Sequence, residues 1–214
     1  MTQGIIFDLD GTLLSTEADL TNAINTMLVQ MDCKTLSEDI VKSYLGNGIR
    51  KLVERSLPMN RHDQLEEAIN IFHAAYAKCY MDFTVPYSGI LEVLTTVQDK
   101  GYRLAVVSNK PQRYLDDLVH KHFPMIHFDC VYGESSTHKT KPNPQGIDLA
   151  LKAMNCKAED TFMVGDSVVD IETAHVCGLK CVPVAWGFQS ESLLAEKAQK
   201  EVVKKPLDLL QSLI

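Results

Sequence analysis

The sequence predicts an α/β protein, a doubly wound parallel sheet with an inserted all-helical cap. Short apolar runs alternate with stretches in which apolar residues recur at helical spacing, a pattern typical of βαβ units. Three of the runs end abruptly in polar residues, as expected where strands meet a site at the carboxyl edge of a parallel sheet. Between residues 15 and 82 the alternation stops, and no run in this block suits a strand.

These patterns divide the chain into two domains. Residues 1–14 and 83–214 form the predicted α/β core, and residues 15–82 form the predicted helical cap. Because the cap follows the first strand directly, we expect it to cover the carboxyl end of that strand. The junctions near Ser15 and Thr84 are the natural hinges, so we expect the cap to open for product release.

The individual elements follow in chain order. The first strand, Ile5 to Phe7, is an unbroken apolar run that suits burial on both faces. The predicted cap helices, which share apolar residues at steps of three and four, cover residues 20–31, 38–45, 49–57 and 65–79. The predicted later core strands cover residues 104–107, 128–132, 162–164 and 181–184. The predicted core helices cover residues 90–100, 145–154 and 168–177, with others after Pro111, Ser190 and Pro206.

Composition excludes several classes of function. The 214 residues are 45% hydrophobic and 23% charged, which is ordinary for a globular protein. The formal net charge is −7 without a Lys/Arg-rich run, so neither nucleic acid nor a membrane surface is an expected partner. No stretch has the pattern of a signal peptide or the length of a membrane span, and the expected location is cytoplasmic. The sequence is compatible with both a monomer and a homodimer.

The six cysteines are scattered without a paired framework, and we expect reduced thiols. Cys177 and Cys181, with His175 nearby, could be imagined as metal ligands. Their spacing matches no zinc pattern and a second ligand pair is missing, so core packing is the favoured interpretation.

Candidate catalytic residues stand at the ends of three predicted strands: Asp8, Ser108 and Asp166. A parallel sheet gathers such ends on one edge, so we expect these side chains to converge. Asp10 lies two residues beyond Asp8 and precedes Gly11, where a glycine permits a positive φ or a close backbone approach. For this pair alone, the alternative is a strand running into an Asp-Gly turn with two solvated acids.

The chemistry that suits these groups is phosphoryl transfer through an aspartyl-phosphate. Asp8 is the candidate nucleophile, and Mg²⁺ held by Asp8 and Asp166 would neutralise the charge of a phosphate. Lys141 would supply a second cation, and Ser108 would supply a neutral hydroxyl donor. Two neighbouring carboxylates do not both ionise easily, so we expect Asp10 to be held protonated. It would protonate the leaving alkoxide and later deprotonate the attacking water.

Two assignments leave alternatives open. Asp170 lies four residues after Asp166, on one helical face, and could ligate the metal through water or orient Lys141. A surface acid stabilised at a helix N-terminus is the plainer alternative for Asp170. Lys139 competes with Lys141 for the cationic role, and both could be solvated loop lysines. The prolines on either side of Asn143 stiffen the loop after Lys141 and favour that residue.

Four motifs follow one another along the chain: Asp8-Leu9-Asp10-Gly11-Thr12, Ser108, Lys141-Pro142-Asn143-Pro144 and Gly165-Asp166-Ser167-Val168-Val169-Asp170. In this order they resemble the motifs of the haloacid dehalogenase superfamily. The resemblance implies a Rossmann-like core with strand order 5-4-1-2-3, Asp8 as nucleophile and Asp10 as acid–base group. It also implies Mg²⁺ bound by Asp8, the main-chain carbonyl of Asp10 and Asp166. Asp170 is a further candidate ligand from its position on the helix alone. Thr12 and Asn109 are assigned to substrate binding.

The helical insertion resembles the small cap of the branch that contains phosphoglycolate phosphatases. In that branch a cap loop chooses the leaving group. Here the loop is Leu45 to Arg50, with Gly48 and Arg50 as candidate substrate-binding residues. The alternative is a helix-breaking turn with a solvent-facing arginine. We therefore expect a phosphatase that acts on a small, phosphoglycolate-like metabolite.

A sugar phosphomutase of β-phosphoglucomutase type is the main alternative activity. Those mutases carry a His in the first cap helix, where this chain has Glu17 to Leu20, and a Lys in the cap loop, where this chain has Leu45. Both differences disfavour a mutase. A pyrophosphatase or nucleotidase of the same superfamily stays open. A non-catalytic binding module is disfavoured, because a binder has no need of paired acids.

Overall fold

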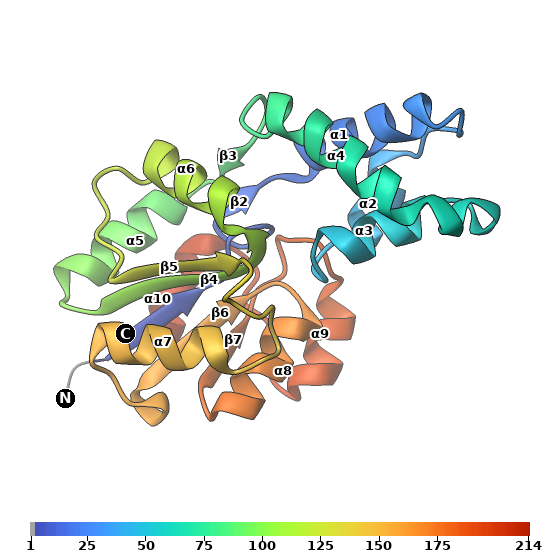
Figure 1. Ribbon diagram of the computed structural model, residues 1–214. Coiled ribbons are helices and arrows are strands. Elements are labelled where there is room, and N and C mark those ends of the chain that lie inside the picture. Colours follow the sequence, from blue (N-terminus) through green and yellow to red (C-terminus); the bar gives the residue numbers. More distant parts are fainter. Residues whose placement is uncertain (1–2) are drawn as a thin grey trace. The chain divides into compact units, whose positions relative to one another are not determined.

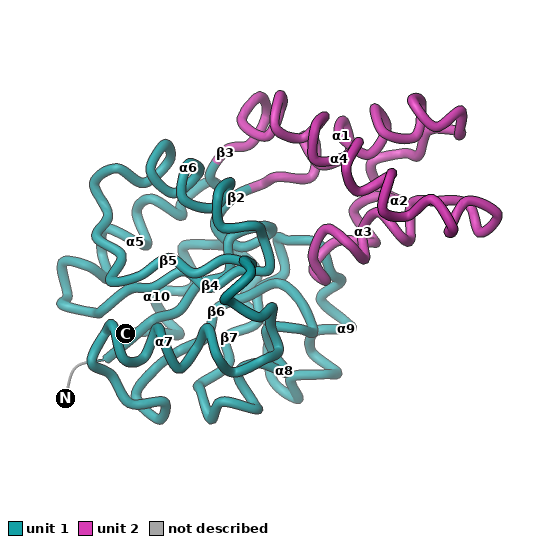
Figure 2. Tube along the Cα trace, in the orientation of Figure 1, with its two compact units in different colours: residues 1–14, 86–214 teal, residues 15–85 magenta. Residues whose placement is uncertain are grey.

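The chain folds into two compact units (Figure 2). The structure is a computed structural model that describes residues 3–214. One unit, called the core below, comprises the chain up to Leu14 together with Pro86–Ile214, and the other, called the cap unit, comprises Ser15–Val85. The second boundary was predicted between residues 82 and 83 and lies between residues 85 and 86.

A five-stranded parallel sheet forms the centre of the core (Figure 1). Across the sheet the strands are β5 (Cys130–Glu134), β4 (Arg103–Pro111), β1 (Gly4–Phe7), β6 (Thr161–Gly165) and β7 (Lys180–Pro183). The first strand in the sequence, β1, pairs in parallel with β4 on one side and with β6 on the other. Counted along the sequence, β1, β4, β5, β6 and β7 are strands 1 to 5 of the core sheet, so their order from β7 to β5 is 5-4-1-2-3. The predicted doubly wound fold and this predicted strand order are confirmed.

Helices cover both faces of this sheet (Figure 1). They are α5 (Ile90–Asp99), α6 (Gln112–His122), α7 (Gln145–Met154), α8 (Val168–Cys177), α9 (Glu191–Ala198) and α10 (Leu209–Leu213), with short 3₁₀ turns η2 (Ala158–Asp160) and η3 (Pro206–Asp208). Alternate strand residues such as Ile6 and Met163 join Ile147 of α7 and Ala174 of α8 in one apolar cluster. All four residues of β1 are buried, because a central parallel strand is covered on both faces.

The edge strand β5 begins at Cys130 instead of at the predicted residue 128. Phe128 packs edge-on against Phe123, with ring centroids 6.2 Å apart. Asp129 forms an ion pair with Arg103 of the neighbouring strand. The predicted strand therefore starts two residues too early, although the main-chain N–H of Asp129 still donates to the carbonyl oxygen of Leu104 at 2.7 Å.

The cap unit is helical, as the sequence predicts. Its helices are α1 (Glu17–Gln30), α2 (Glu38–Ser43), α3 (Ile49–Ser56) and α4 (Leu65–Cys79), with the 3₁₀ segment η1 (Met59–Gln64). α1 packs against α2 and α4, and α3 also packs against α4. Phe72 and Tyr76 of α4 are fully buried with stacked rings 5.5 Å apart. Two short strands, β2 (Leu14–Ser15) and β3 (Val85–Pro86), pair where the chain enters and leaves the unit.

A buried carboxylate, that of Asp19, fastens the two ends of the cap unit together. It accepts hydrogen bonds from the main-chain N–H groups of Phe83 and Thr84 and from the Thr84 hydroxyl, the last at 2.7 Å. A buried carboxylate is costly without such donors. This cluster therefore ties α1 to the segment that leaves the unit.

Two further expectations concern the chain as a whole. Within residues 3–214, no helix is both long enough and apolar enough to cross a membrane. All six cysteines are free. Cys177 and Cys181 pack against the apolar cluster under α7 and α8, which supports core packing over a metal site for this pair.

Candidate active site

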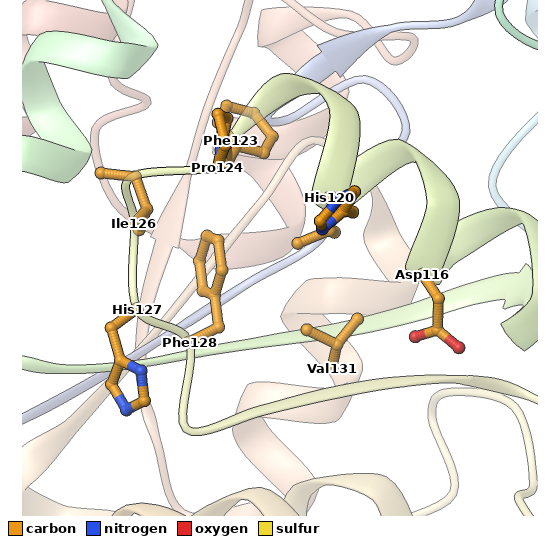
Figure 3. A pocket seen from close by; sticks show the side chains of 9 residues that line it. Asp116, His120, Phe123, Pro124, Ile126, His127, Phe128 and Val131 are labelled. Atoms are coloured by element: carbon orange, nitrogen blue, oxygen red, sulfur yellow. The ribbon is translucent and has the colours of Figure 1, made fainter.

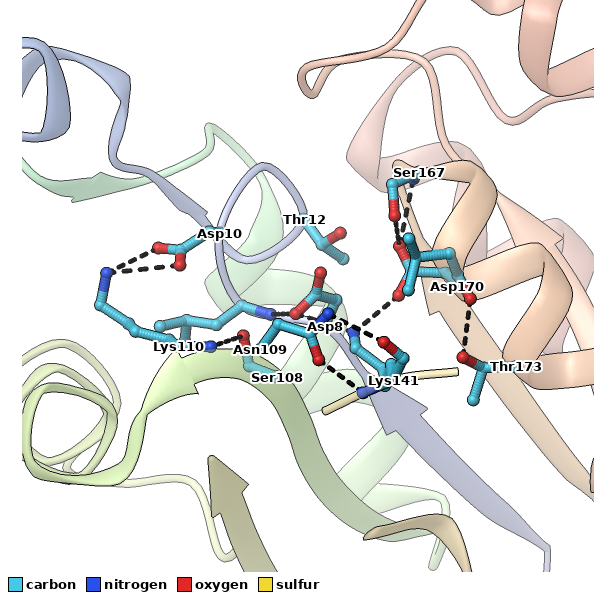
Figure 4. A network of polar contacts seen from close by, with 12 residues as sticks. Asp8, Asp10, Thr12, Ser108, Asn109, Lys110, Lys141, Ser167, Asp170 and Thr173 are labelled. Atoms are coloured by element: carbon cyan, nitrogen blue, oxygen red, sulfur yellow. Dashed lines mark hydrogen bonds and ion pairs between the residues drawn. The ribbon is translucent and has the colours of Figure 1, made fainter. Parts of the chain in front are cut away.

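The carboxyl ends of three neighbouring strands bring polar side chains together (Figure 4). Asp8 follows β1, Ser108 lies near the end of β4 and Asp166 follows β6, and all three are buried. The Ser108 hydroxyl hydrogen-bonds to the Asp8 carboxylate. The structure thus brings these predicted residues together, because parallel strands end on the same edge of the sheet.

Lys141 is the buried cation of this cluster. Its Nζ lies 3.1 Å from Asp8 Oδ1 and 2.6 Å from Asp170 Oδ1. Burial opposes the charge of Lys141, but the carboxylates of Asp170 and Asp8 outweigh burial and raise the pKa of this lysine above its usual value. Lys139, the competing candidate, is exposed. A charged ammonium group therefore stands beside Asp8.

Asn109 holds the main chain of Lys141. Its Oδ1 accepts a hydrogen bond from Lys141 N at 2.6 Å, and its Nδ2 donates to Lys141 O at 3.2 Å. An amide side chain offers a donor and an acceptor, so it can match both peptide groups of one residue. The structure therefore shows a positioning contact for Asn109, and its substrate-binding role stays a prediction.

Asp170 contacts Lys141 and also caps helix α8. Its Oδ1 contacts the lysine, while its Oδ2 accepts hydrogen bonds from the main-chain N–H and the hydroxyl of Ser167, at 3.1 and 2.6 Å. The Ser167 side chain in turn accepts from the main-chain N–H of Asp170, and these contacts together form a capping box. Gly165 permits this close approach, since a Cβ there would lie 2.2 Å from Asp170 Cγ. Of the predicted roles, these contacts support orientation of Lys141.

Asp166 is held by two hydrogen-bond donors. Thr12 Oγ1 donates to Asp166 Oδ1 at 2.9 Å, and the main-chain N–H of Phe188 donates to Oδ2 at 2.7 Å. Gly11 and Gly187 lie so close that a Cβ would come within 2.4 and 2.3 Å of Asp166 Oδ2. The predicted substrate-binding residue Thr12 therefore positions Asp166 in this structure, and contact with substrate stays a prediction.

The buried acids carry more negative charge than Lys141 compensates. Burial is the largest cause that raises the pKa of Asp8 from 3.8 to about 6, against the lowering effect of Lys141. Burial, and then the charges of Asp170 and Asp8, raise the pKa of Asp166 well above its usual range. A further cation at this place would favour the ionised forms of both acids.

A divalent metal ion fits this donor set. Carboxylate oxygens of Asp8, Asp166 and Asp170 lie within 4.8 Å of one another and are buried. Oxygen donors of this type are the ligands that Mg²⁺ prefers. All three carboxylates also contact other residues: Asp8 and Asp170 contact Lys141, and Asp166 accepts from Thr12 and Phe188, so the choice of ligands among them stays a prediction.

Asp10 contacts a different lysine. Lys110 Nζ lies 3.0 Å from Asp10 Oδ1 and 3.3 Å from Oδ2. Figure 4 shows this pair on the other side of Asp8 from Lys141. The structure thus pairs Asp10 with a cation, where the sequence predicted a carboxyl group kept protonated by its neighbour Asp8.

Residues 108–110 form a bulge at the end of β4. The paired positions on either side of it, Val107 and Pro111, face residues of β5 that are separated only by Gly133. A bulge re-aims side chains at the end of a strand. A Cβ at Gly133 would lie 2.5 Å from the carbonyl oxygen of Lys110, so glycine allows the bulge to pack against β5. One irregularity therefore delivers Ser108, Asn109 and Lys110 to the site.

Comparison with known proteins places this site in a family. Residues 5–184 match the family model described as haloacid dehalogenase-like hydrolase. The chain belongs to this family. A phosphoglycolate phosphatase of Pseudomonas syringae pv. tomato is 33% identical over 205 residues, which cover 93% of this chain and 75% of that protein. A phosphoglycolate phosphatase of Nitrosospira multiformis is 33% identical over 191 residues, with 87% and 84% covered.

Solved structures share the fold of this haloacid dehalogenase-like hydrolase. A crystallised candidate phosphoglycolate phosphatase from Lactobacillus delbrueckii subsp. bulgaricus superposes with a TM-score of 0.94 at 28% identity, over 100% of this chain and 99% of that one. A haloacid dehalogenase-like family protein from Streptococcus pneumoniae superposes with a TM-score of 0.89 at 22% identity, over 100% and 99%, and shows the fold alone. The resemblance found in the motifs is confirmed.

Sequence reasoning missed two parts of this hydrolase's site. Lys110 directly follows the strand-ending pair Ser108 and Asn109, and a charged residue at that place is a signal that could have identified it. Phe188 acts through its main-chain N–H, which no side-chain pattern reveals. Its loop is anchored by Trp186, whose Nε1 donates to the carbonyl oxygen of Thr12 at 3.0 Å.

Two predicted substrate-binding residues, Gly48 and Arg50, lie in the cap unit of this hydrolase. Gly48 has a φ of 81° and directly precedes α3, which agrees with the predicted turn. Arg50 is exposed and forms an ion pair with Glu66 of α4. Substrate binding by both residues stays a prediction.

A separate hollow of about 410 Å³ lies between α6 and the segment before β5 (Figure 3). Its lining includes His120, Phe123 and Phe128, and none of the predicted site residues. Its acidic lining residue, Asp116, does not belong to the buried acidic cluster. This hollow is therefore distinct from the cluster of charged residues at the edge of the sheet.

Proposed function

We propose that this chain is a Mg²⁺-dependent phosphatase that hydrolyses a small phosphorylated metabolite through an aspartyl-phosphate on Asp8. The proposal rests on the residues that surround Asp8. Its buried carboxylate contacts Lys141 and the Ser108 hydroxyl, and oxygens of Asp166 and Asp170 lie close to it. A phosphoryl group placed against Asp8 would meet a nucleophile, a cation and a hydroxyl donor together.

In the first step of the proposed reaction, a carboxylate oxygen of Asp8 attacks phosphorus. The bond from phosphorus to the leaving oxygen breaks, and its electron pair stays on that oxygen. Asp10, which the proposal requires to be protonated at this step although it lies beside Lys110, gives that oxygen a proton, so that an alcohol departs. Lys141 and Ser108 stabilise the charge on the phosphoryl oxygens, and Asp170 keeps Lys141 in place.

In the second step, water hydrolyses the aspartyl-phosphate. Asp10, now a carboxylate, accepts a proton from the water molecule as its oxygen attacks phosphorus. The bond between phosphorus and the Asp8 oxygen breaks, which returns the Asp8 carboxylate and releases inorganic phosphate. Asp10 ends the cycle protonated, because the proton that it takes from water replaces the one that left with the alcohol.

The proposed metal ligands are Asp8, Asp166 and the main-chain carbonyl of Asp10, the last as implied by the family. When bound, Mg²⁺ would neutralise charge on the phosphate and lower the repulsion that the nucleophile meets. Thr12 and the main-chain N–H of Phe188 orient Asp166 for this role.

The proposed substrate is phosphoglycolate or a metabolite like it. Relatives named phosphoglycolate phosphatase match most of this chain, which supports the proposal. Arg50 in the cap unit is the proposed partner of an anionic group on the substrate. Leu45 stands where phosphomutases carry a Lys, and the stretch from Glu17 to Leu20 contains no His where they carry one. Both differences support hydrolysis over isomerisation.

The proposed location is the cytoplasm. All six cysteines are free thiols. Free thiols persist in reducing compartments, and this agreement supports the location.

Phosphate release with and without Mg²⁺ tests the proposal. The panel contains phosphoglycolate, sugar phosphates, nucleoside monophosphates and pyrophosphate. Asp8→Asn removes the nucleophile, so we expect release to fall more than about 1,000-fold and the acid-stable phosphoenzyme to disappear. Asp148→Asn, on the exposed side of α7, is the matched control. Full release by Asp8→Asn would contradict the mechanism. If the wild-type protein released phosphate from no compound but isomerised β-glucose 1-phosphate, the mutase would be favoured.

Asp10→Asn tests the assignment of the acid–base group. We expect turnover to fall about 100- to 10,000-fold, because both proton transfers are lost. Mg²⁺ binding, measured by calorimetry, should stay largely intact, because Asp10 is assigned only a main-chain oxygen as ligand. Loss of Mg²⁺ binding in this variant would contradict the assignment.

A further inference from the structure

We propose that Lys110 is a positioning residue for the reaction: it holds the Asp10 carboxylate in the place from which both proton transfers occur. The inference rests on the proposed function, in which Asp10 is the acid–base group. Lys110 lies in the bulge of β4, next to two residues already assigned to the site, Ser108 and Asn109.

The contact between Lys110 and Asp10 defines where the carboxylate lies. Lys110 Nζ is within 3.0 and 3.3 Å of the two carboxylate oxygens, so it sets the rotation of the carboxylate plane as well as its position. The second side-chain torsion of an aspartate is otherwise broad. A carboxylate that must face a leaving oxygen and then a water molecule gains from being held in one orientation.

Lys110 is itself held firmly. Its side chain is 2% exposed, whereas that of Asp10 is 19% exposed. Its main-chain N–H donates to Ser108 Oγ at 3.4 Å, and its carbonyl oxygen packs against Gly133 of β5. The ammonium group is therefore the buried, fixed partner, and Asp10 is the solvent-facing group that it orients.

The position of Lys110 also separates the two acids. Lys141 contacts Asp8, and Figure 4 shows Lys110 on the opposite side of that carboxylate. Asp10 thus contacts a cation outside the place where Lys141 would meet the phosphoryl group, and it does not compete with phosphate for Lys141. The alternative is a purely structural pair, in which Asp10 only satisfies a buried lysine.

Lys110→Met tests the proposal in the full-length protein with saturating Mg²⁺. Met keeps the length and the apolar stem of lysine and removes the charge. We expect kcat for the best phosphate ester to fall about 10- to 100-fold, with KM changed less than about threefold, because Lys110 is placed against Asp10 and not against the phosphoryl group. Lys110→Arg should recover part of kcat. Lys139→Met, an exposed lysine in the core, is the matched control and should leave both constants unchanged.

A double-mutant cycle separates positioning from a structural role. In the Asp10→Asn background, Lys110→Met should lower kcat less than about twofold, because the group that it positions no longer transfers protons. A structural role predicts the same fold-loss in both backgrounds, and that result would overturn the proposal. The kcat of Lys110→Gln and of Lys110→Arg is also measured with and without Asp10→Asn, so the outcome does not depend on the folding of one variant.

Failure of the proposed function would look different. If the wild-type protein released phosphate from no compound, the proposed phosphatase activity would fail first. If the wild-type protein were active and Lys110→Met kept its kcat, only the role of Lys110 would be overturned.

Discussion

Asp8 and Asp10 are separated by one residue at the end of β1, yet their surroundings differ. Asp8 shares Lys141 with Asp170 and lies beside the buried Asp166, so one lysine contacts two of the three clustered acids. Asp10 is paired with Lys110 in a more exposed contact. The first cluster keeps an excess of negative charge that suits a metal ion, and the second is balanced locally. Charge balance in three dimensions, more than spacing in the sequence, separates the proposed metal-binding acid, Asp8, from the proposed proton-transfer acid, Asp10.

The largest expected effect is on the free energy of unfolding when the lysine of each cluster is replaced. Without metal, Lys141→Met should lower the free energy of unfolding by about 3–5 kcal/mol, because buried carboxylates lose their cation. Lys110→Met should lower it by about 1 kcal/mol, because Asp10 is partly solvated. Urea denaturation in the presence of a chelator measures both values, with Lys139→Met as control. Equal losses for the two variants would remove the contrast between the clusters.

The pH dependence of stability sharpens the comparison. The pKa of Asp8 is raised from 3.8 to about 6 by burial, so the folded protein binds this proton more tightly than the unfolded chain. The contribution of Asp8 is therefore fully present below about pH 4 and is lost as pH rises through about 6. Between pH 4 and 7 the metal-free wild type should lose about 2 kcal/mol relative to Asp8→Asn. Parallel stability curves for the two proteins would contradict this.

A smaller effect is expected from the hydroxyl that holds Asp166. Thr12→Val removes the hydrogen bond to Asp166 at nearly the same volume, and we expect Mg²⁺ to bind about tenfold more weakly in calorimetry. Thr12→Ser keeps the hydroxyl and should bind within about twofold of wild type. Lys110→Met, on the Asp10 side, should also leave Mg²⁺ affinity unchanged. If Lys110→Met weakened Mg²⁺ binding as much as Thr12→Val, the two clusters would be one coupled unit.

Much of this site could be predicted from local sequence. Apolar runs that end in Asp8, Ser108 and Asp166 imply strands whose ends meet at one edge, and the sheet has that form. The prolines after Lys141 favoured it over Lys139, and the structure buries Lys141 and exposes Lys139. These predictions succeed because strand burial and loop stiffness depend on residues that are neighbours in the sequence.

The contacts that distinguish the two acids depended on tertiary structure. Asp10 and Lys110 are far apart in the sequence and meet only because β1 and β4 are adjacent and β4 bulges opposite Gly133. Phe188 reaches Asp166 through a main-chain N–H, whose direction is set by the course of its loop. The sequence by itself determined the fold, the strand-end acids and the family. Packing decided which lysine holds which acid, because pairing of buried charges depends on distances that only the assembled sheet defines.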